Sequence, residues 1–217
     1  MKTRNKERNE VTFGTYNNAA KKYQDKVMGM DLYDDTYDMF CNLIEKKNAE
    51  IFEIASGPGN VTKYLLSKRP DFKITGSDIA PNMNKLAKIN NPKADFLLMD
   101  CRDIEKLGRK FDAIMCGFCM PYLSKEECRK LISDTSKLLN PNGLLYFSTM
   151  EDDYDKSGFE TTSFSGPDQV YIYYHQADYL MDCLTDNGFQ IIEMQRKDCP
   201  EPDGTFFTDK IFIARKI

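Results

Sequence analysis

The amino-acid sequence predicts an α/β fold: a doubly wound, mainly parallel sheet of seven strands with an N-terminal helical cap and a β-hairpin insertion. The main observation is that short apolar segments, of strand length, alternate with amphipathic segments of helix length. Such alternation indicates right-handed crossovers between parallel strands. The second observation is the length, because 217 residues suffice for one domain of this kind with a buried core. We therefore predict a single domain over residues 1–217.

The first segment, residues 1–45, precedes any strand-like segment and carries tyrosines at helix-like spacing, which predicts a helical cap. The core, residues 46–150, holds five expected strands with helices between them. Pro81 suits the first turn of one helix, and Ser124 with Glu127 forms a capping box for another. The strands are expected at 49–55, 72–80, 94–100, 111–117 and 143–150, and the helices at 60–69, 81–90 and 124–139.

The alternation is interrupted at residues 151–175. There "GFETTSFS" and "VYIYYHQ" flank "GPDQ", which predicts a hairpin inserted after the fifth strand. The last unit, residues 176–217, begins with a helix that is expected to end at Gly188. It closes with "FQIIEMQR" and "DKIFIARK", two strands that we expect to be antiparallel.

Composition excludes several classes of function. The net charge of −4 argues against a nucleic-acid backbone as the main partner. The chain has no run of about 18 apolar residues, so no membrane-spanning helix is expected. The charged start "MKTRNKERNE" does not resemble a secretory signal, and seven scattered cysteines suit reduced thiols. We therefore expect a cytoplasmic protein, as a monomer or a homodimer.

The stretch "IFEIASGPGN" places a glycine loop directly after the first expected strand, where doubly wound sheets bind ligands. A dinucleotide loop would need a third glycine where Thr62 stands. Glu53, at the end of the strand, would repel a pyrophosphate but would favour a cationic ligand. A nicotinamide-dependent oxidoreductase therefore fits this loop less well, and it stays as an alternative.

The segment "EIASGPG" resembles the first motif of the class I S-adenosylmethionine-dependent methyltransferases, E/D-x-G-x-G-x-G, with Ala55 in place of the first glycine. The resemblance covers roughly residues 45–150 and the final helix and two strands, and it depends on the joint order of Glu53, the loop, Asp78 and Asp100. It implies a Rossmann-like methyltransferase fold with the last strand antiparallel, and S-adenosylmethionine as the cofactor. A cofactor-binding protein without turnover is the alternative.

The resemblance also implies roles for individual residues. Asp78 would take both ribose hydroxyls, and Asp100 with Cys101 would contact the adenine edge. Residues 116–120 would contact the methionine part and the substrate. The cofactor-binding residues implied in this way lie in the loop and at three strand ends: Glu53, Ala55, Ser56, Gly57, Gly59, Asp78, Ile79, Met83, Asp100, Cys101, Cys116 and Gly117.

The acceptor is expected to be a small polar organic molecule that attacks in line through oxygen or nitrogen. Nothing in the sequence demands a metal. The identity of the acceptor is not encoded in a motif, and segments 1–45 and 151–175, which we expect to form a lid, are where the family places its specificity. The expected acceptor pocket is lined mainly by aromatic residues: Tyr16, Tyr23, Phe118, Met120, Tyr122 and Tyr174.

Four features keep two interpretations each. His175 is a candidate general base, but a structural role near a helix start is favoured, since it has no evident partner. Cys116 and Cys119 are interpreted as small pocket residues, with a thiol redox or metalloid role as the alternative. The acidic run 151–155 is either a solvated turn or a contact for a cationic amine. The hairpin is either a pocket wall or a dimer edge.

Overall fold

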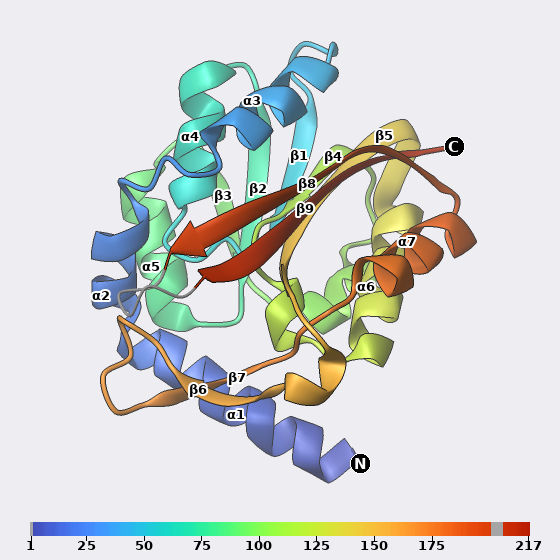
Figure 1. The fold of residues 1–217 in the computed structure, drawn as a ribbon. Helices are drawn as coiled ribbons and strands as arrows, with labels where there is room; N and C mark the ends of the chain where they lie inside the picture. Colours follow the sequence, from blue (N-terminus) through green and yellow to red (C-terminus); the bar gives the residue numbers. More distant parts are fainter. Residues whose placement is uncertain (1, 201–205) are drawn as a thin grey trace.

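The computed structural model describes residues 2–200 and 206–217. Met1, at the start of the expected cap, and residues 201–205, within the expected C-terminal unit, lie outside the described residues. Within the described part, one seven-stranded sheet has the order β3-β2-β1-β4-β5-β9-β8, and helices lie on both of its faces (Figure 1). Strands β1 to β5 are mutually parallel, and β9 is antiparallel to both β5 and β8. The predicted fold class is confirmed.

The large sheet and a separate two-stranded sheet together contain nine strands among the described residues. They are β1 (Glu50–Ile54), β2 (Lys73–Asp78), β3 (Asp95–Leu98), β4 (Phe111–Cys116), β5 (Leu139–Glu151), β6 (Gly158–Thr161), β7 (Gln169–Ile172), β8 (Phe189–Pro200) and β9 (Phe206–Lys216). The α-helices are α1 (Lys2–Asn18), α2 (Ala20–Val27), α3 (Asp34–Leu43), α4 (Asn60–Lys68), α5 (Pro81–Asn90), α6 (Lys125–Leu138) and α7 (Ala177–Asp186). Three short 3-10 helices are η1 (Cys101–Leu107), η2 (Met120–Tyr122) and η3 (Tyr154–Lys156).

The sheet is buried on both faces, as continuous apolar strands such as β1 require. On one face Phe52 stacks on Phe111 beneath α6 and α7. On the other face Tyr146 packs against Tyr37 and Phe40 of α3. These two apolar layers fix the carboxyl ends of β1, β2 and β4 relative to one another, at the same end of the parallel strands.

Some boundaries differ from the prediction. Strand β5 begins at Leu139, before the "NPNG" turn, because Leu139 pairs with Phe111 across an irregular register. Strand β3 is shorter than expected, and the unexpected helix η1 follows it. The second expected strand ends at Asp78, where the chain turns into α5.

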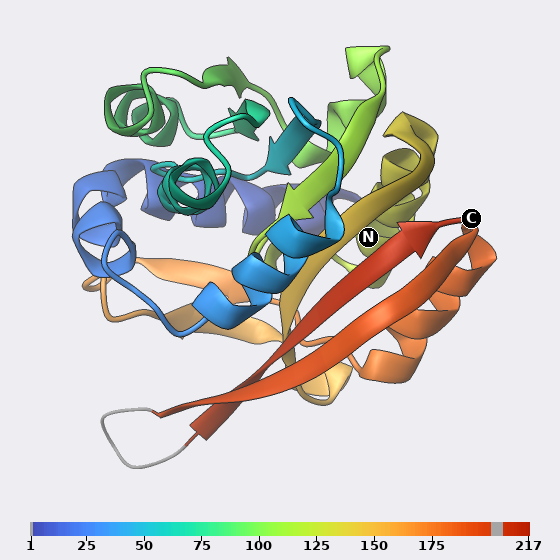
Figure 2. The ribbon, with the colours of Figure 1, turned by 90° about the horizontal axis from the view of Figure 1, so that it is seen from above.

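The predicted hairpin is present as β6 and β7, and it packs on α1 (Figure 1). The backbone N–H of Tyr171 donates to Thr12 Oγ1 at 2.9 Å, and Thr15 Oγ1 donates to the carbonyl of Gln169 at 2.6 Å. The guanidinium of Arg8 lies 4.0 Å from the centre of the Tyr171 ring. Helix α1 and the hairpin thus form one unit at the carboxyl ends of the parallel strands, and β9 and β8 form the edge of the large sheet opposite β3 (Figure 2). None of the described helices combines the length and the apolar character needed to cross a bilayer.

Candidate functional site

The glycine loop joins β1 to α4 in a conformation that needs small residues. Ala55, Gly57 and Gly59 all have positive φ, at 53°, 53° and 78°. A Cβ atom on Gly59 would lie 2.3 Å from Asn91 Nδ2, which donates to the Gly59 carbonyl at 2.9 Å. The left-handed backbone explains why glycine is usual at position 55, and alanine there costs about 1–2 kcal/mol.

Asp78, at the end of β2, is fixed against this loop. Its Oδ2 accepts the backbone N–H of Gly57 at 2.9 Å, and its Oδ1 accepts that of Ala80 at 2.8 Å. Burial raises the pKa of Asp78, and the two backbone hydrogen bonds oppose that shift. Each carboxyl oxygen keeps a lone pair for a ligand hydroxyl.

Glu53 lies beneath the loop, buried in the protein. Burial raises the pKa of Glu53 to about 8, and the hydrogen bond that Thr62 Oγ1 donates to its Oε2 opposes the shift. The Glu53 carboxyl is therefore largely protonated at neutral pH, and a cation above the loop would favour its ionised form. Thr62 occupies the position of the third glycine of a dinucleotide loop. In this protein its hydroxyl donates a hydrogen bond to the Glu53 carboxyl group.

A cavity of about 130 Å³ lies between the glycine loop, the ends of β2 and β4, and the helices of the cap. Twelve of the residues that the sequence analysis assigned to the cofactor or the acceptor line it. They are Tyr16, Tyr23, Ala55, Gly57, Asp78, Ile79, Met83, Asp100, Cys101, Gly117, Phe118 and Tyr122. Sequence reasoning missed other lining residues, namely Asn9, Thr12, Phe13, Ala80, Met99, Arg102 and Leu123.

Asp100 and Arg102 both line the cavity. Arg102 Nε donates to both carboxyl oxygens of Asp100, at 2.9 and 3.0 Å, and its NH1 lies 3.3 Å from Glu127 Oε1. Burial alone would raise the pKa of Asp100, but the hydrogen bonds from Arg102 lower it. Glu127 belongs to the predicted capping box of α6, which is present. The ion pair therefore links the part of the lining around Asp100 to the start of α6.

Aromatic side chains from the cap and from η2 also line the cavity. Tyr16, Tyr23, Tyr122 and Phe164, which we call the aromatic cluster, have ring centres 5.0–5.2 Å apart in four contacting pairs. The hydroxyls of Tyr16 and Tyr122, which we call the tyrosine pair, are hydrogen-bonded to each other. Burial raises the pKa of Tyr122 to about 12 and raises that of Tyr16 well above its usual value. Both hydroxyls are therefore protonated at neutral pH.

The chain is similar to known methyltransferases in sequence. A profile of the family described as "Methyltransferase domain" matches residues 51–143. Demethylmenaquinone methyltransferase of Thermotoga maritima is 26% identical over 168 residues, covering 72% of this chain and 72% of that protein. Malonyl-[acyl-carrier protein] O-methyltransferase of Acetivibrio thermocellus is 26% identical over 144 residues, covering 65% of this chain and 46% of that protein, so this chain spans less than half of that relative.

Solved methyltransferases share the fold. Magnesium protoporphyrin IX methyltransferase from Synechocystis PCC 6803 with bound SAH is 16% identical, with a TM-score of 0.73 over 96% of this chain and 99% of that one. The profile match and these similarities in sequence and fold together support a class I, Rossmann-like S-adenosylmethionine-dependent methyltransferase. A methyltransferase structure from Methanosarcina mazei agrees, with 19% identity and a TM-score of 0.69 over 82% of this chain and 97% of that one.

Some expected residues lie outside the lining of the cavity. His175 is fully buried, with Nε2 3.0 Å from the Leu123 carbonyl and 3.2 Å from that of Met120, and burial lowers its pKa. It thus fixes the turn that carries Tyr122. Tyr174 donates to Glu160 within the hairpin at 2.7 Å. The other expected residues outside the lining are Glu53, Ser56, Gly59, Cys116 and Met120.

The acidic run has partners of its own. Glu151 accepts from Arg196 and Lys210, and Asp152 accepts from Lys156 at 2.8 Å. These acids line no part of the cavity.

The cysteines after β3 and β4 meet at the cavity. Cys101 and Cys119 line it, their thiols are hydrogen-bonded, and this contact together with burial raises the pKa of Cys101 well above its usual value. Cys116 is buried next to Cys119. Within the described residues, no three His, Cys, Asp or Glu side chains are grouped to hold a metal ion.

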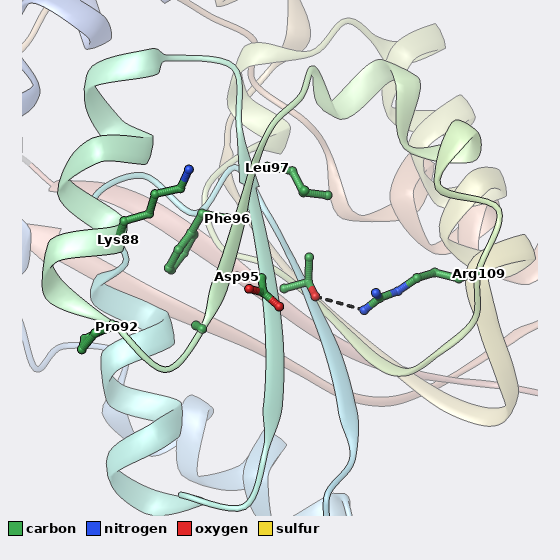
Figure 3. A pocket seen from close by; sticks show the side chains of 8 residues that line it. Lys88, Pro92, Asp95, Phe96, Leu97 and Arg109 are labelled. Carbon is green, nitrogen blue, oxygen red and sulfur yellow. Dashed lines mark hydrogen bonds between the residues drawn. The ribbon is translucent and has the colours of Figure 1, made fainter.

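A second hollow lies along β3, at the outer edge of the sheet (Figure 3). Lys88, Asp95, Phe96 and Arg109 line it, and Arg109 donates to Thr75 Oγ1 at 3.0 Å. It is more open than the cavity, and no expected site residue lines it. The candidate site is therefore the cavity at the carboxyl ends of the strands.

Proposed function

We propose that this chain binds S-adenosylmethionine in the cavity and transfers its methyl group to a small organic acceptor. The observation that carries the proposal is the position of Asp78. Two backbone N–H groups fix its carboxyl group beside the glycine loop, in the cavity that three tyrosines of the aromatic cluster also line. A ribose anchor beside aromatic side chains in one cavity supports methyl transfer as the reaction.

The residues present fit the cofactor part by part. Asp78 offers one free lone pair on each oxygen, which suits two neighbouring hydroxyls. Ile79, Met83 and Met99 offer an apolar surface for a base, next to Asp100. Gly57 has no side chain, so the backbone of the loop is open to close approach. When bound, the cofactor would supply a methyl group already activated by its sulfonium.

The side chains of this protein would then orient and enclose the reactants. A ring atom of Tyr23 lies 3.6 Å from the place of a Cβ atom on Gly57, so the cap lies directly on the loop. Excluding water strengthens electrostatic interactions within the site, and holding the reactants in line lowers the entropic barrier. Ionised Glu53 would stabilise a positive charge above the loop.

Calorimetry with S-adenosylmethionine and S-adenosylhomocysteine tests the binding step, with a nicotinamide dinucleotide as the negative control. We expect both adenosyl compounds to bind and the dinucleotide not to bind. Tight dinucleotide binding in place of adenosyl binding would favour the oxidoreductase. Incubation with a small-molecule extract and methyl-labelled cofactor, followed by mass spectrometry, separates an enzyme from a protein that binds the cofactor without turnover.

A further inference from the structure

Two cysteine side chains from different segments of the chain meet in the cavity. Cys101 begins η1, and Cys119 directly precedes η2. Both line the cavity, and their thiols are hydrogen-bonded to each other. Cys101 also packs against the apolar cluster on the α6 side of the sheet, to which Cys119 belongs. Two thiols in contact are the arrangement from which a disulfide forms.

The two thiols differ in their access to a small molecule. Cys101 is half-buried, whereas the Cys119 side chain is almost completely covered. An oxidant that enters the cavity would therefore reach Cys101 first, with Cys119 beside it as the second thiol. Cys116 also contacts Cys119, but it is fully buried and does not line the cavity. Cys101 and Cys119 are thus the pair that is both in contact and open to the cavity.

A bond between these cysteines would join two walls of the cavity. Helix η1 begins next to Asp100, and η2 ends at Tyr122, whose hydroxyl is hydrogen-bonded to Tyr16 of the cap. The cavity of about 130 Å³ is smaller than ordinary ligand sites of roughly 300–1,000 Å³, so its walls must separate to admit a cofactor. A covalent link between the two walls would oppose that separation.

We propose that Cys101 and Cys119 form a reversible disulfide that lowers the affinity of the cavity for the cofactor. The inference rests on the proposed function for its ligand. The oxidant is a hydroperoxide such as hydrogen peroxide. The first sulfur bonds to a peroxide oxygen as the O–O bond breaks, which gives a sulfenic acid and one water. The second sulfur then bonds to the first, and the displaced hydroxide leaves as a second water with the remaining thiol proton. A dithiol reductant reverses the change by thiol–disulfide exchange.

The rate of this oxidation should depend strongly on pH, because the thiolate and not the thiol is the nucleophile. The hydrogen bond with Cys119, together with burial, raises the pKa of Cys101 well above its usual value, so thiolate is scarce near neutral pH. Disulfide formation should therefore accelerate about tenfold for each unit that the pH rises. The other titratable groups whose charge acts on the two thiols or responds to them are Asp100, Arg102, Cys116, Tyr122 and Cys128.

The first test treats the reduced protein with hydrogen peroxide and maps the product by mass spectrometry. The tryptic peptide 94–102 carries Cys101, and the tryptic peptide 111–125 carries Cys116 and Cys119. We expect a disulfide that links the two peptides, and fragmentation should assign it to Cys119. Saturation with S-adenosylhomocysteine should slow its formation at least about tenfold, because a ligand in the cavity covers Cys101.

The second test measures the consequence for binding. Calorimetry compares the Kd of S-adenosylhomocysteine for the reduced protein, for the oxidised protein, and for the oxidised protein after treatment with dithiothreitol. We expect oxidation to raise the Kd at least about tenfold. Reduction should restore the original Kd, because the disulfide is the only covalent change.

Single Cys101→Ser and Cys119→Ser variants locate the effect. In each of them, hydrogen peroxide should leave the Kd for S-adenosylhomocysteine within about twofold of the value before treatment. Cys41→Ala is the matched control, because Cys41 is a buried cysteine of α3 outside the cavity lining. It should keep the full response to oxidation. The peptide map of the unmodified protein tests the pairing even where a variant fails to fold.

Each remaining outcome overturns a defined step. A disulfide between Cys116 and Cys119, or oxidation to sulfinic acid without a disulfide, overturns the pairing. The expected disulfide with an unchanged Kd overturns its effect on the cofactor. Failure of the reduced protein to bind S-adenosylhomocysteine overturns the proposed function, and the effect on binding falls with it. The peptide map needs no ligand, so it separates a wrong pairing from a wrong cofactor.

Discussion

Replacing Asp78 by alanine tests how the ribose is held. The structure gives this carboxyl group one free lone pair on each oxygen, because backbone N–H groups occupy one position on each. Hydrogen bonds to a charged group contribute about 1.5–3 kcal/mol each, so losing two removes about 3–6 kcal/mol before desolvation is counted. Burial of Asp78 offsets part of this. A net loss of about 2.7 kcal/mol, or about a hundredfold in Kd, is the expected result for S-adenosylhomocysteine.

The assay must separate the ribose contacts from the loop that Asp78 also holds. Calorimetry therefore compares adenosine with 2′,3′-dideoxyadenosine on the unmodified protein and on Asp78→Ala. The unmodified protein should prefer adenosine, and the variant should lose that preference even if its loop is altered. Asp112→Ala is the control, because Asp112 pairs with Lys46 outside the cavity lining. An unchanged preference for adenosine in folded Asp78→Ala would refute the assigned contact.

Four further predictions follow from the geometry. Gly59→Ala should abolish cofactor binding and lower the melting temperature, because its Cβ would meet Asn91 and its φ is 78°; an unshifted melting curve would contradict this. The affinity ratio of S-adenosylmethionine to S-adenosylhomocysteine should rise with pH through about 8, as Glu53 ionises, and calorimetry should find that rise missing in Glu53→Gln. Burial lowers the pKa of His175, so below about pH 6.5 the unfolded chain binds a proton at this residue more readily than the folded chain does. The free energy of unfolding should therefore fall as the pH drops below about 6.5. Urea titrations of His175→Gln should show a smaller fall. The cavity of about 130 Å³ is below the roughly 300 Å³ of ordinary ligand sites, so the cap must open to admit a cofactor; hydrogen exchange in α1 and the β6–β7 hairpin should slow with bound S-adenosylhomocysteine at any protein concentration, whereas slowing that follows protein concentration would make the hairpin an interface.

The meeting of the glycine loop and Asp78 in one cavity could be predicted because its signals are local. The loop follows its strand directly, and Asp78 ends the next strand, so parallel packing brings them together. The positive φ at Ala55 shows why the motif has glycine there. The presence of each strand of the large sheet was predictable from hydrophobic patterns for the same reason, whereas the bounds of β3 and β5 differed from the prediction.

The acceptor side could not be predicted in this detail because its contacts join distant parts of the chain. Tyr16 and Tyr122 are 106 positions apart, and no periodicity links them. Arg102 follows Asp100 closely, but only the fold shows that it occupies both oxygens of that acid and also reaches Glu127. The contacts of His175 with two backbone carbonyls could not be predicted from the sequence, because every residue type has a backbone carbonyl.

The pairing of α1 with β7 also has a consequence for the order of folding. Thr12 is made early on the ribosome, but its partner Tyr171 is made 159 residues later. Contacts of such long separation form late, because closing the intervening loop costs entropy. At a synthesis rate of about 5–20 residues per second, roughly 10–30 seconds pass between the synthesis of α1 and that of β7. We therefore expect the strands around the glycine loop to form first in the nascent chain. The contact between α1 and the β6–β7 hairpin, which covers the cavity, should form last.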